Sequence, residues 1–512
     1  MQPDRAGPTP DAPTRLADQL WRALGLSGGE DEHARGVRIS LVAVAVQAAL
    51  RIVVVIANAR LVAPDDTGVF QAGLSIIVLV SALCDPGLSE TVARRRALSR
   101  AGEATIVWIN WALGALGAGA IYFGATALAA LAGAPGSAEA IRVMAVLPLL
   151  AALFAGPISQ MRRRRRYRAL ILIETGACAA GVVATIATGL LVGGWWALAA
   201  FQFAYFAIKA IACHVLEPTR PAALFRVRTV ATTMAYSSAA WASRLLMQAA
   251  SQVDKLIVGA VLGMAVLGVY SRAALLVGVP LTLMATAGAA TLVPSYAALR
   301  GDPDNLSRFF VHTTRTLALL LFPAFFGMAA LADPIVNLLF SSGTRWNWSG
   351  AAAIFAALAP GAALEAQLRQ HSAVRFALGK PRAALATTGA HTGLVLTGAL
   401  VGATTLGALG AAFGYGLANL VCFPVSVALA ARETHTPLNR IIAAVAPPLV
   451  AAGAMALAVR GLARVCAQAG AGPAMQIVLL APIGAALYGA LLMVLLWAGA
   501  KRRAIWSASR KA

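Results

Sequence analysis

The chain has 512 residues, of which 59% are hydrophobic and only 12% are charged, and it carries a formal net charge of +22. Soluble proteins carry about 25% charged residues, so this composition nearly excludes a soluble multidomain protein. The apolar runs are continuous and about 20 residues long, which suits helices that satisfy their own backbone hydrogen bonds in a membrane. We therefore expect an all-α, polytopic membrane protein.

Fourteen apolar segments follow one another along the chain, and each is long enough to span a bilayer. They cover roughly 39–61, 69–92, 104–132, 139–160, 169–192, 194–215, 232–258, 264–298, 309–340, 350–376, 384–404, 406–431, 440–461 and 474–499. The first 38 residues contain Pro, Asp, Arg and Gly without an apolar core, so they do not predict a cleavable signal peptide.

Most of the 42 Lys and Arg residues fall in every second loop between these segments. Such a bias predicts that both termini lie in the cytoplasm and that the number of spans is even. In a soluble protein the net charge would suggest nucleic acid, but here topology explains it. The run Arg162–Arg166 is accordingly interpreted as an anchor against anionic lipid, and no nucleic-acid partner is expected.

A short motif recurs at an offset of 200 residues: Gly68-Val69-Phe70 opens the second span and Gly268-Val269-Tyr270 opens the eighth. Six helices separate equivalent positions, so the repeat predicts two six-helix lobes related by a parallel pseudo-twofold axis. We expect a cytoplasmic N-terminal extension (1–38), a first lobe (39–215), a cytoplasmic linker (216–231), a second lobe (232–431), two further helices (432–499) and a basic cytoplasmic tail (500–512).

Polar residues recur along one face of the seventh span. Arg244, Gln248, Ser251 and Lys255 follow one another at steps of four, three and four residues, which is a helical face. This face predicts the wall of a hydrated cavity between the lobes. The alternative is that these residues hold neighbouring helices together and that Lys255 extends outward beside Asp254, its local partner.

Further cations lie inside other apolar spans. Arg51 stands near the middle of the first span, where a charge costs about 2.5 to 3.5 kcal/mol, and Arg272 lies one or two turns inside the eighth. We interpret both as cavity residues that bind a polyanionic head group, although Arg272 could instead reach the surface. Gln202, Tyr205 and Lys209 form a weaker polar stripe on the sixth span, and Lys209 is expected to reach the cytoplasmic interface.

Three intramembrane carboxylates, Glu365, Asp85 and Asp254, are candidates for coupling transport to H⁺ or Na⁺, with Glu365 preferred. The sequence contains no GxxxxGK[ST], HExxH or GxSxG motif, so neither nucleotide hydrolysis nor another enzymatic activity is expected. The five cysteines include no CxxC pair and the histidines are dispersed, so no metal site and no cofactor are predicted.

Several segments resemble Wzx-type polysaccharide flippases of the multidrug/oligosaccharidyl-lipid/polysaccharide superfamily. The resemblance covers roughly residues 36–430, and its motifs are Arg60–Phe70, Asp85–Glu90, Asp254–Gly259, Leu267–Ala273, Gly343–Trp346 and Leu378–Pro381. Pro86 departs from the pattern, which has a bulky apolar residue there.

This resemblance implies an exporter of the bacterial inner membrane that alternates between inward-open and outward-open states. Its implied cargo is an oligosaccharide linked through pyrophosphate to undecaprenol, used for exopolysaccharide, capsule or O-antigen, and its implied partners are a polysaccharide polymerase and export machinery. In the related lipid II flippases, cations on the first and eighth helices face the cavity, and Arg51 and Arg272 occupy comparable helices here.

Two alternatives remain open. Multidrug efflux by the same fold would favour an acidic or aromatic cavity for organic cations, and the basic stripe argues against it. A membrane scaffold, glycosyltransferase or polymerase without transport is the other, but a polymerase would be expected to have a large periplasmic loop, and the longest outer loop expected here is short.

Overall fold

The computed structural model describes residues 32–85, 100–164, 166–217, 227–341 and 346–509, and within these ranges it contains helices and no strands. The first half comprises α2 (Glu32–Leu61), α3 (Pro64–Cys84), α5 (Arg100–Leu131), α6 (Ala138–Met144), α7 (Leu147–Arg163), α8 (Tyr167–Leu191) and α9 (Trp196–Leu216). The second half comprises α10 (Val227–Leu262), α11 (Met264–Ala298), α12 (Pro303–Ala330), α13 (Ala332–Val336), α14 (Gly350–Ala377), α15 (Pro381–Glu433), α16 (Leu438–Gln468) and α17 (Pro473–Ser509).

The all-α prediction is confirmed, but the number of fourteen spans is not. Among the described residues, twelve helices are long and apolar enough to cross a membrane, and α2 is not one of the twelve. α15 counts once among them although it contains two arms that fold back at Gly407, whose φ of 66° suits only glycine. The arms are so close that a Cβ at Gly402 would lie 2.0 Å from the carbonyl oxygen of Gly410.

Two of the expected continuous spans are interrupted. The fourth is divided into α6 and α7, and the ninth gives way after α12 to α13 and a π-helical turn, Asn337–Ser341. Pro148 and Pro334 lie in the first turns of α7 and α13, where a missing backbone N–H is tolerated. Apolar length alone could not reveal these breaks.

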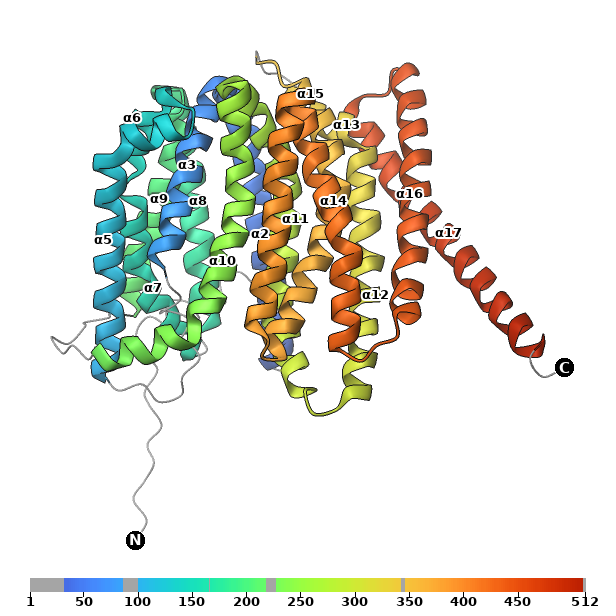
Figure 1. Cartoon of the computed structure of the whole chain (residues 1–512). Coiled ribbons are helices and arrows are strands. Elements are labelled where there is room, and N and C mark those ends of the chain that lie inside the picture. The colour runs from blue at the N-terminus through green and yellow to red at the C-terminus, as the bar shows by residue number, and fades with distance from the viewer. Residues whose placement is uncertain (1–31, 86–99, 165, 218–226, 342–345, 510–512) are drawn as a thin grey trace, which may run out of the picture.

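The helices form two lobes with α2 and α10 between them. Figure 1 shows most of the first lobe on the left, with α12, α14 and α15 to its right. α2 packs on α8 of the first lobe and on the turn after α13, while α10 packs on α15 and on α3. α16 packs on α12 and α17, and α17 leans away at the far right.

The expected extension 1–38, linker 216–231, tail 500–512 and motifs at 85–90 and 343–346 lie partly outside the described residues.

The repeated motif lies where the lobes touch. A Cβ at Gly68 would lie 1.9 Å from the carbonyl oxygen of Met264, and one at Gly268 would lie 1.9 Å from that of Pro64. These two contacts are equivalent under the 200-residue offset, and together we call them the glycine contact. Because no side chain fits there, only glycine allows the first turns of α3 and α11 to meet through their backbones.

Polar contacts join helix ends at the opposite end of the bundle. Glu217, at the end of α9, accepts a hydrogen bond of 3.1 Å from Arg166, which precedes α8. In the second lobe, Arg375 near the end of α14 donates to Glu433 at the end of α15, at 3.0 Å. The lobes therefore meet through glycine at one end, while polar and charged side chains tie the helix ends within each lobe at the other.

Candidate functional site

A cavity of about 770 Å³ lies between the lobes, lined by α2, α3 and α9 on one side and by α10, α11, α14 and α15 on the other. We call it the central cavity. Its charged lining residues are the cations Arg51, Lys255, Arg272 and Arg369 and the carboxylates Asp254 and Glu365. Basic groups therefore outnumber acidic ones in its wall.

Most of the residues singled out from the sequence line this cavity. They are Arg51, Gln248, Ser251, Lys255, Arg272, Asp254 and Glu365. Arg244 lies on α10, one turn before Gln248, but its side chain is outside the part of the structure that is described, so its place in the cavity stays a prediction. Asp85 directly follows α3, is exposed and is not among the lining residues.

Arg272 is a buried cation that has no acidic partner among the described residues. The residue is 5% exposed, and its one hydrogen bond in the described structure runs from Nη2 to the hydroxyl of Thr67, at 3.4 Å. Its Nε atom is buried and has no partner. Burying an unpaired charge costs several kcal/mol, so an arrangement of this kind is expected where a ligand supplies the opposite charge.

Arg51 brings a second guanidinium from the other lobe. No described side chain forms an ion pair with it, and Glu174, which acts on it electrostatically, is already bound by Lys209 and Tyr205. Arg51 lies ten residues before the end of α2 and Arg272 eight residues after the start of α11. At 1.5 Å per residue, Arg51 is about 15 Å from the end of α2 and Arg272 about 12 Å from the start of α11, and both line the central cavity.

The expected local pairing of Asp254 with Lys255 is confirmed. Their Oδ1 and Nζ atoms are 3.4 Å apart, and the Tyr270 hydroxyl donates to the other carboxylate oxygen at 3.2 Å. Lys255 also donates to the backbone carbonyl of Ser251. Lys255 therefore contributes less free positive charge to the cavity than Arg51 and Arg272 do.

Glu365 is the centre of a polar network on the second-lobe wall. Arg369 donates to it through Nε and Nη2 at 3.0 and 2.6 Å, and the Tyr415 hydroxyl also donates to it. His391 lies beside this group and bonds to Asn419 at 3.0 Å. Neither Arg369 nor Tyr415 was predicted from the sequence as a partner of Glu365. The four-residue spacing of Glu365 and Arg369 on one helix could have indicated the first of these pairs.

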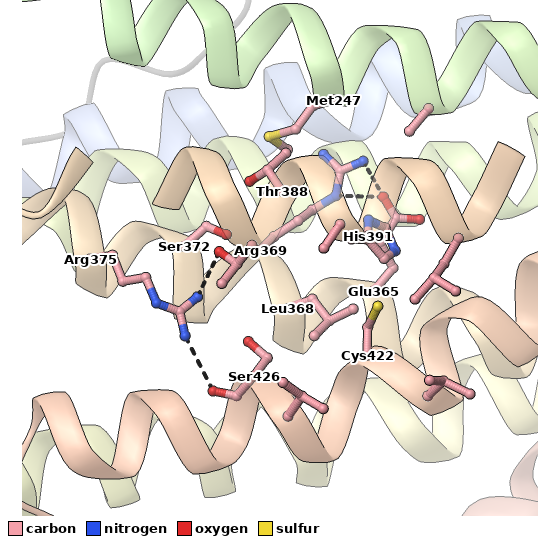
Figure 2. A pocket seen from close by; sticks show the side chains of 16 residues that line it. Met247, Glu365, Leu368, Arg369, Ser372, Arg375, Thr388, His391, Cys422 and Ser426 are labelled. Carbon is pink, nitrogen blue, oxygen red and sulfur yellow. Dashed lines mark hydrogen bonds and ion pairs between the residues drawn. The ribbon is translucent and has the colours of Figure 1, made fainter. Parts of the chain in front are cut away.

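A smaller pocket of about 170 Å³ continues from the central cavity into the second lobe, and Figure 2 shows its lining. Glu365, Arg369 and His391 line both spaces. Arg375, farther along the pocket, is 1% exposed and is paired with Glu433. The cations of this pocket are therefore already neutralised, which distinguishes it from the region of Arg51 and Arg272.

The prediction for Lys209 was wrong. Instead of reaching the interface, its side chain is 14% exposed, lies 2.8 Å from the Glu174 carboxylate and sits over the Phe154 ring at 4.9 Å. Tyr205, four residues earlier, donates to the same carboxylate. The half-buried carboxylate of Glu174 on α8 pairs with this lysine, and no fixed spacing in the sequence indicates a pairing between two different helices.

The model of a family described as "Polysaccharide biosynthesis protein" matches residues 58–350. The chain belongs to this family. Among its relatives are the succinoglycan biosynthesis transport protein ExoT of Rhizobium meliloti, 24% identical over 58% of this chain and 60% of the relative, and the lipopolysaccharide biosynthesis protein WzxC of Escherichia coli, 22% identical over 61% and 63%. The alignments thus span less than two thirds of these relatives.

Similar solved structures show to which fold this chain belongs. A lipid II flippase MurJ in an inward closed conformation aligns with a TM-score of 0.68 at 11% identity, covering 90% of this chain and 98% of the flippase. An inward-facing multidrug resistance MATE family transporter aligns with a TM-score of 0.63 at 18% identity, covering 76% and 94%. The predicted two-lobed, multi-pass membrane fold is confirmed.

Proposed function

We propose that this protein flips an undecaprenyl-pyrophosphate-linked oligosaccharide across the bacterial inner membrane by alternating access. It would serve the biosynthesis of exopolysaccharide, capsule or O-antigen, with both termini in the cytoplasm and with a polysaccharide polymerase and export machinery as partners. Family membership and relatives named for succinoglycan, lipopolysaccharide and teichuronic acid biosynthesis support the substrate class. The likeness to a lipid II flippase supports the fold that such movement needs.

The observation that carries this proposal is the buried guanidinium of Arg272, which has no acidic partner among the described residues, in a cavity that Arg51 lines from the facing lobe. A pyrophosphate diester carries two negative charges and cannot cross hydrocarbon uncompensated. Guanidinium groups bind phosphate oxygens through paired hydrogen bonds, so these two side chains suit that group. The sugars would occupy the hydrated cavity, while the polyprenyl tail would remain in lipid.

Multidrug efflux coupled to a cation is the alternative, and a MATE transporter shares the fold. An organic cation would require a carboxylate free to receive it. Both carboxylates that line the central cavity already have cationic partners, Asp254 with Lys255 and Glu365 with Arg369. The two cations without such partners disfavour a cationic cargo and favour an anionic one.

A deletion strain tests the function directly. We expect it to stop exporting the polymer and to accumulate lipid-linked oligosaccharide that a membrane-impermeant sugar-oxidising reagent cannot reach from outside. Expression of the intact chain should restore both export and labelling. Accumulated oligosaccharide that is fully labelled without the protein would contradict flipping, and restored drug tolerance without restored export would favour efflux.

Coupling to H⁺ or Na⁺ is proposed at Glu365, with Asp254 and Asp85 as less favoured candidates. Glu365 lines both the central cavity and the smaller pocket, and its charge holds Arg369. Replacing Glu365 with glutamine removes that charge and is expected to make the rate of flipping in proteoliposomes insensitive to an imposed ion gradient. Asp304→Asn, at an exposed position in the first turn of α12 and outside the cavity lining, serves as the control. A Glu365→Gln protein that still responds fully to the gradient would exclude this carboxylate.

A further inference from the structure

The first-lobe wall of the central cavity combines an aromatic ring with uncharged amides. On α9 the lining residues are Leu198, Phe201 and Gln202, and on α2 they are Arg51, Val54 and Asn58. The spacings of three and four residues place each set on one helical face. Beyond Arg51 this wall carries no charged side chain, so it differs from the second-lobe wall.

Phe201 is held in one position by its neighbours. Its ring stacks on Tyr205 with centroids 5.9 Å apart and planes 8° from parallel. Tyr205 is fixed in turn by its hydrogen bond to Glu174 and by Lys209 at 3.1 Å. On α8, a Cβ at Gly181 would approach the Phe201 ring to 2.8 Å, so the glycine leaves room for the ring. Phe201 therefore presents a fixed aromatic surface at the cavity.

Two amides in this lining have polar atoms without a hydrogen-bond partner in the described part of the chain. Asn58 is only 4% exposed, yet its Oδ1 atom has no hydrogen-bond partner. The side-chain amide of Gln202 forms no hydrogen bond within the described part of the chain, although Gln71 and Gln252, also in the lining, are joined through Ser75. A buried amide oxygen without a partner is costly, and a ligand hydroxyl would satisfy it.

The positions of these groups along the helices follow from counting residues from the ends of α2 and α9. The start of α9 lies near the end of α2, because Gly189, at the end of α8 just before α9, lies against Leu61 at the end of α2. Gly194, two residues before α9, lies against Asp66 at the start of α3. Counted along the helices at 1.5 Å per residue, Asn58 is about 5 Å, Phe201 about 8 Å and Arg51 about 15 Å from that end. Along the helices, the ring and Asn58 therefore lie about 7 Å and 10 Å nearer to that end than Arg51 does.

We propose that Phe201, Gln202 and Asn58 form a binding subsite for an uncharged pyranose ring, the sugar attached directly to the diphosphate. This subsite rests on the proposed function, because it places that sugar beside a diphosphate held by Arg51. A pyranose has an apolar C–H face, which packs on an aromatic ring, and hydroxyls that both donate to and accept from amides. An acidic sugar would gain no partner here beyond the cation that already serves the diphosphate.

The test compares two diphosphate diesters of undecaprenol that both carry two negative charges: the methyl ester, here called the bare diphosphate, and the same lipid carrying one neutral hexose in place of the methyl group. The full-length protein in nanodiscs is titrated with each, and the ratio of the two Kd values is the readout. Phe201→Leu and Gln202→Ala should each reduce the preference for the hexose-bearing lipid about fivefold, without changing the Kd of the bare diphosphate. Phe201→Trp should retain the preference, because it keeps an aromatic surface.

Phe203→Leu is the matched control, since Phe203 lies on the same helix but packs against the first-lobe core instead of lining the cavity. An unchanged preference in both Phe201→Leu and Gln202→Ala would overturn the subsite. So would a wild-type protein that binds both lipids equally, while leaving the proposed function intact. A wild-type protein that binds neither lipid would overturn the proposed function and the subsite together.

Discussion

Replacing Arg272 with methionine is expected to abolish polymer export while leaving the protein as stable as the wild type or more so. The guanidinium is buried without an acidic partner, so the empty protein bears a desolvation cost that methionine removes. The lost charge-assisted hydrogen bonds should weaken binding of undecaprenyl diphosphate about 10- to 100-fold. Export by growing cells, lipid affinity and the Tm of the purified protein measure the three effects.

Arg51→Ala should also abolish export, since Arg51 lines the same cavity as Arg272 from the other lobe. Arg60→Gln is the control, because Arg60 lies on the same helix but is exposed and outside the cavity lining. A structural role for Arg272 would instead lower the Tm of Arg272→Met. Normal export by both the Arg51 and the Arg272 variants would remove the basis for a diphosphate site.

Replacing Gly68 or Gly268 with valine is expected to stop transport by preventing α3 and α11 from meeting. Even the Cβ atom would lie 1.9 Å from a carbonyl oxygen of the facing helix, so the helices must separate. In a cysteine-free background, Gln71→Cys in the cavity lining reports on that separation. A thiol reagent that cannot cross the membrane should label it from the outer side much faster in the valine variants than with glycine present.

Gly136→Val provides the control for this experiment. Gly136 lies in the short turn between α5 and α6, has no neighbouring atom within 4 Å of an added Cβ, and does not adopt a positive φ. It should therefore transport and label like the parent protein. Transport at the normal rate by Gly68→Val would mean that the backbones of α3 and α11 need not touch during the cycle.

The lobes and one wall of the site could be predicted because their signals lie within single helices. The spacing of Gln248, Ser251 and Lys255 gives a face regardless of what packs against it, and all three line the cavity. The motif at Gly68 and Gly268 indicated the repeat. It could not indicate that the two copies touch, since that depends on how the lobes are docked.

The pairings between side chains on different helices could not be predicted from the sequence, because they too depend on how the helices pack. Glu174 and Lys209 stand on different helices, as do Glu365 and Tyr415, and neither pair has a fixed spacing in sequence. An unpaired Arg272 could not be distinguished from a paired one until the acids near it were known. Single-chain patterns therefore found cations at the cavity, while only the packed structure separated those that are neutralised from those that are not.

The glycine contact also bears on how easily the lobes part. At the glycine contact the two helices meet through backbone atoms, not through side chains. Weak Cα–H···O contacts of the kind such an approach allows contribute only about 0.5 to 1 kcal/mol each. Separating the two helices there breaks only weak contacts, and the neighbouring hydrogen bond from Arg272 to Thr67 is long, at 3.4 Å. The glycine contact therefore suits lobes that separate and rejoin in every transport cycle, because strong ion pairs or hydrogen bonds at this place would slow their separation.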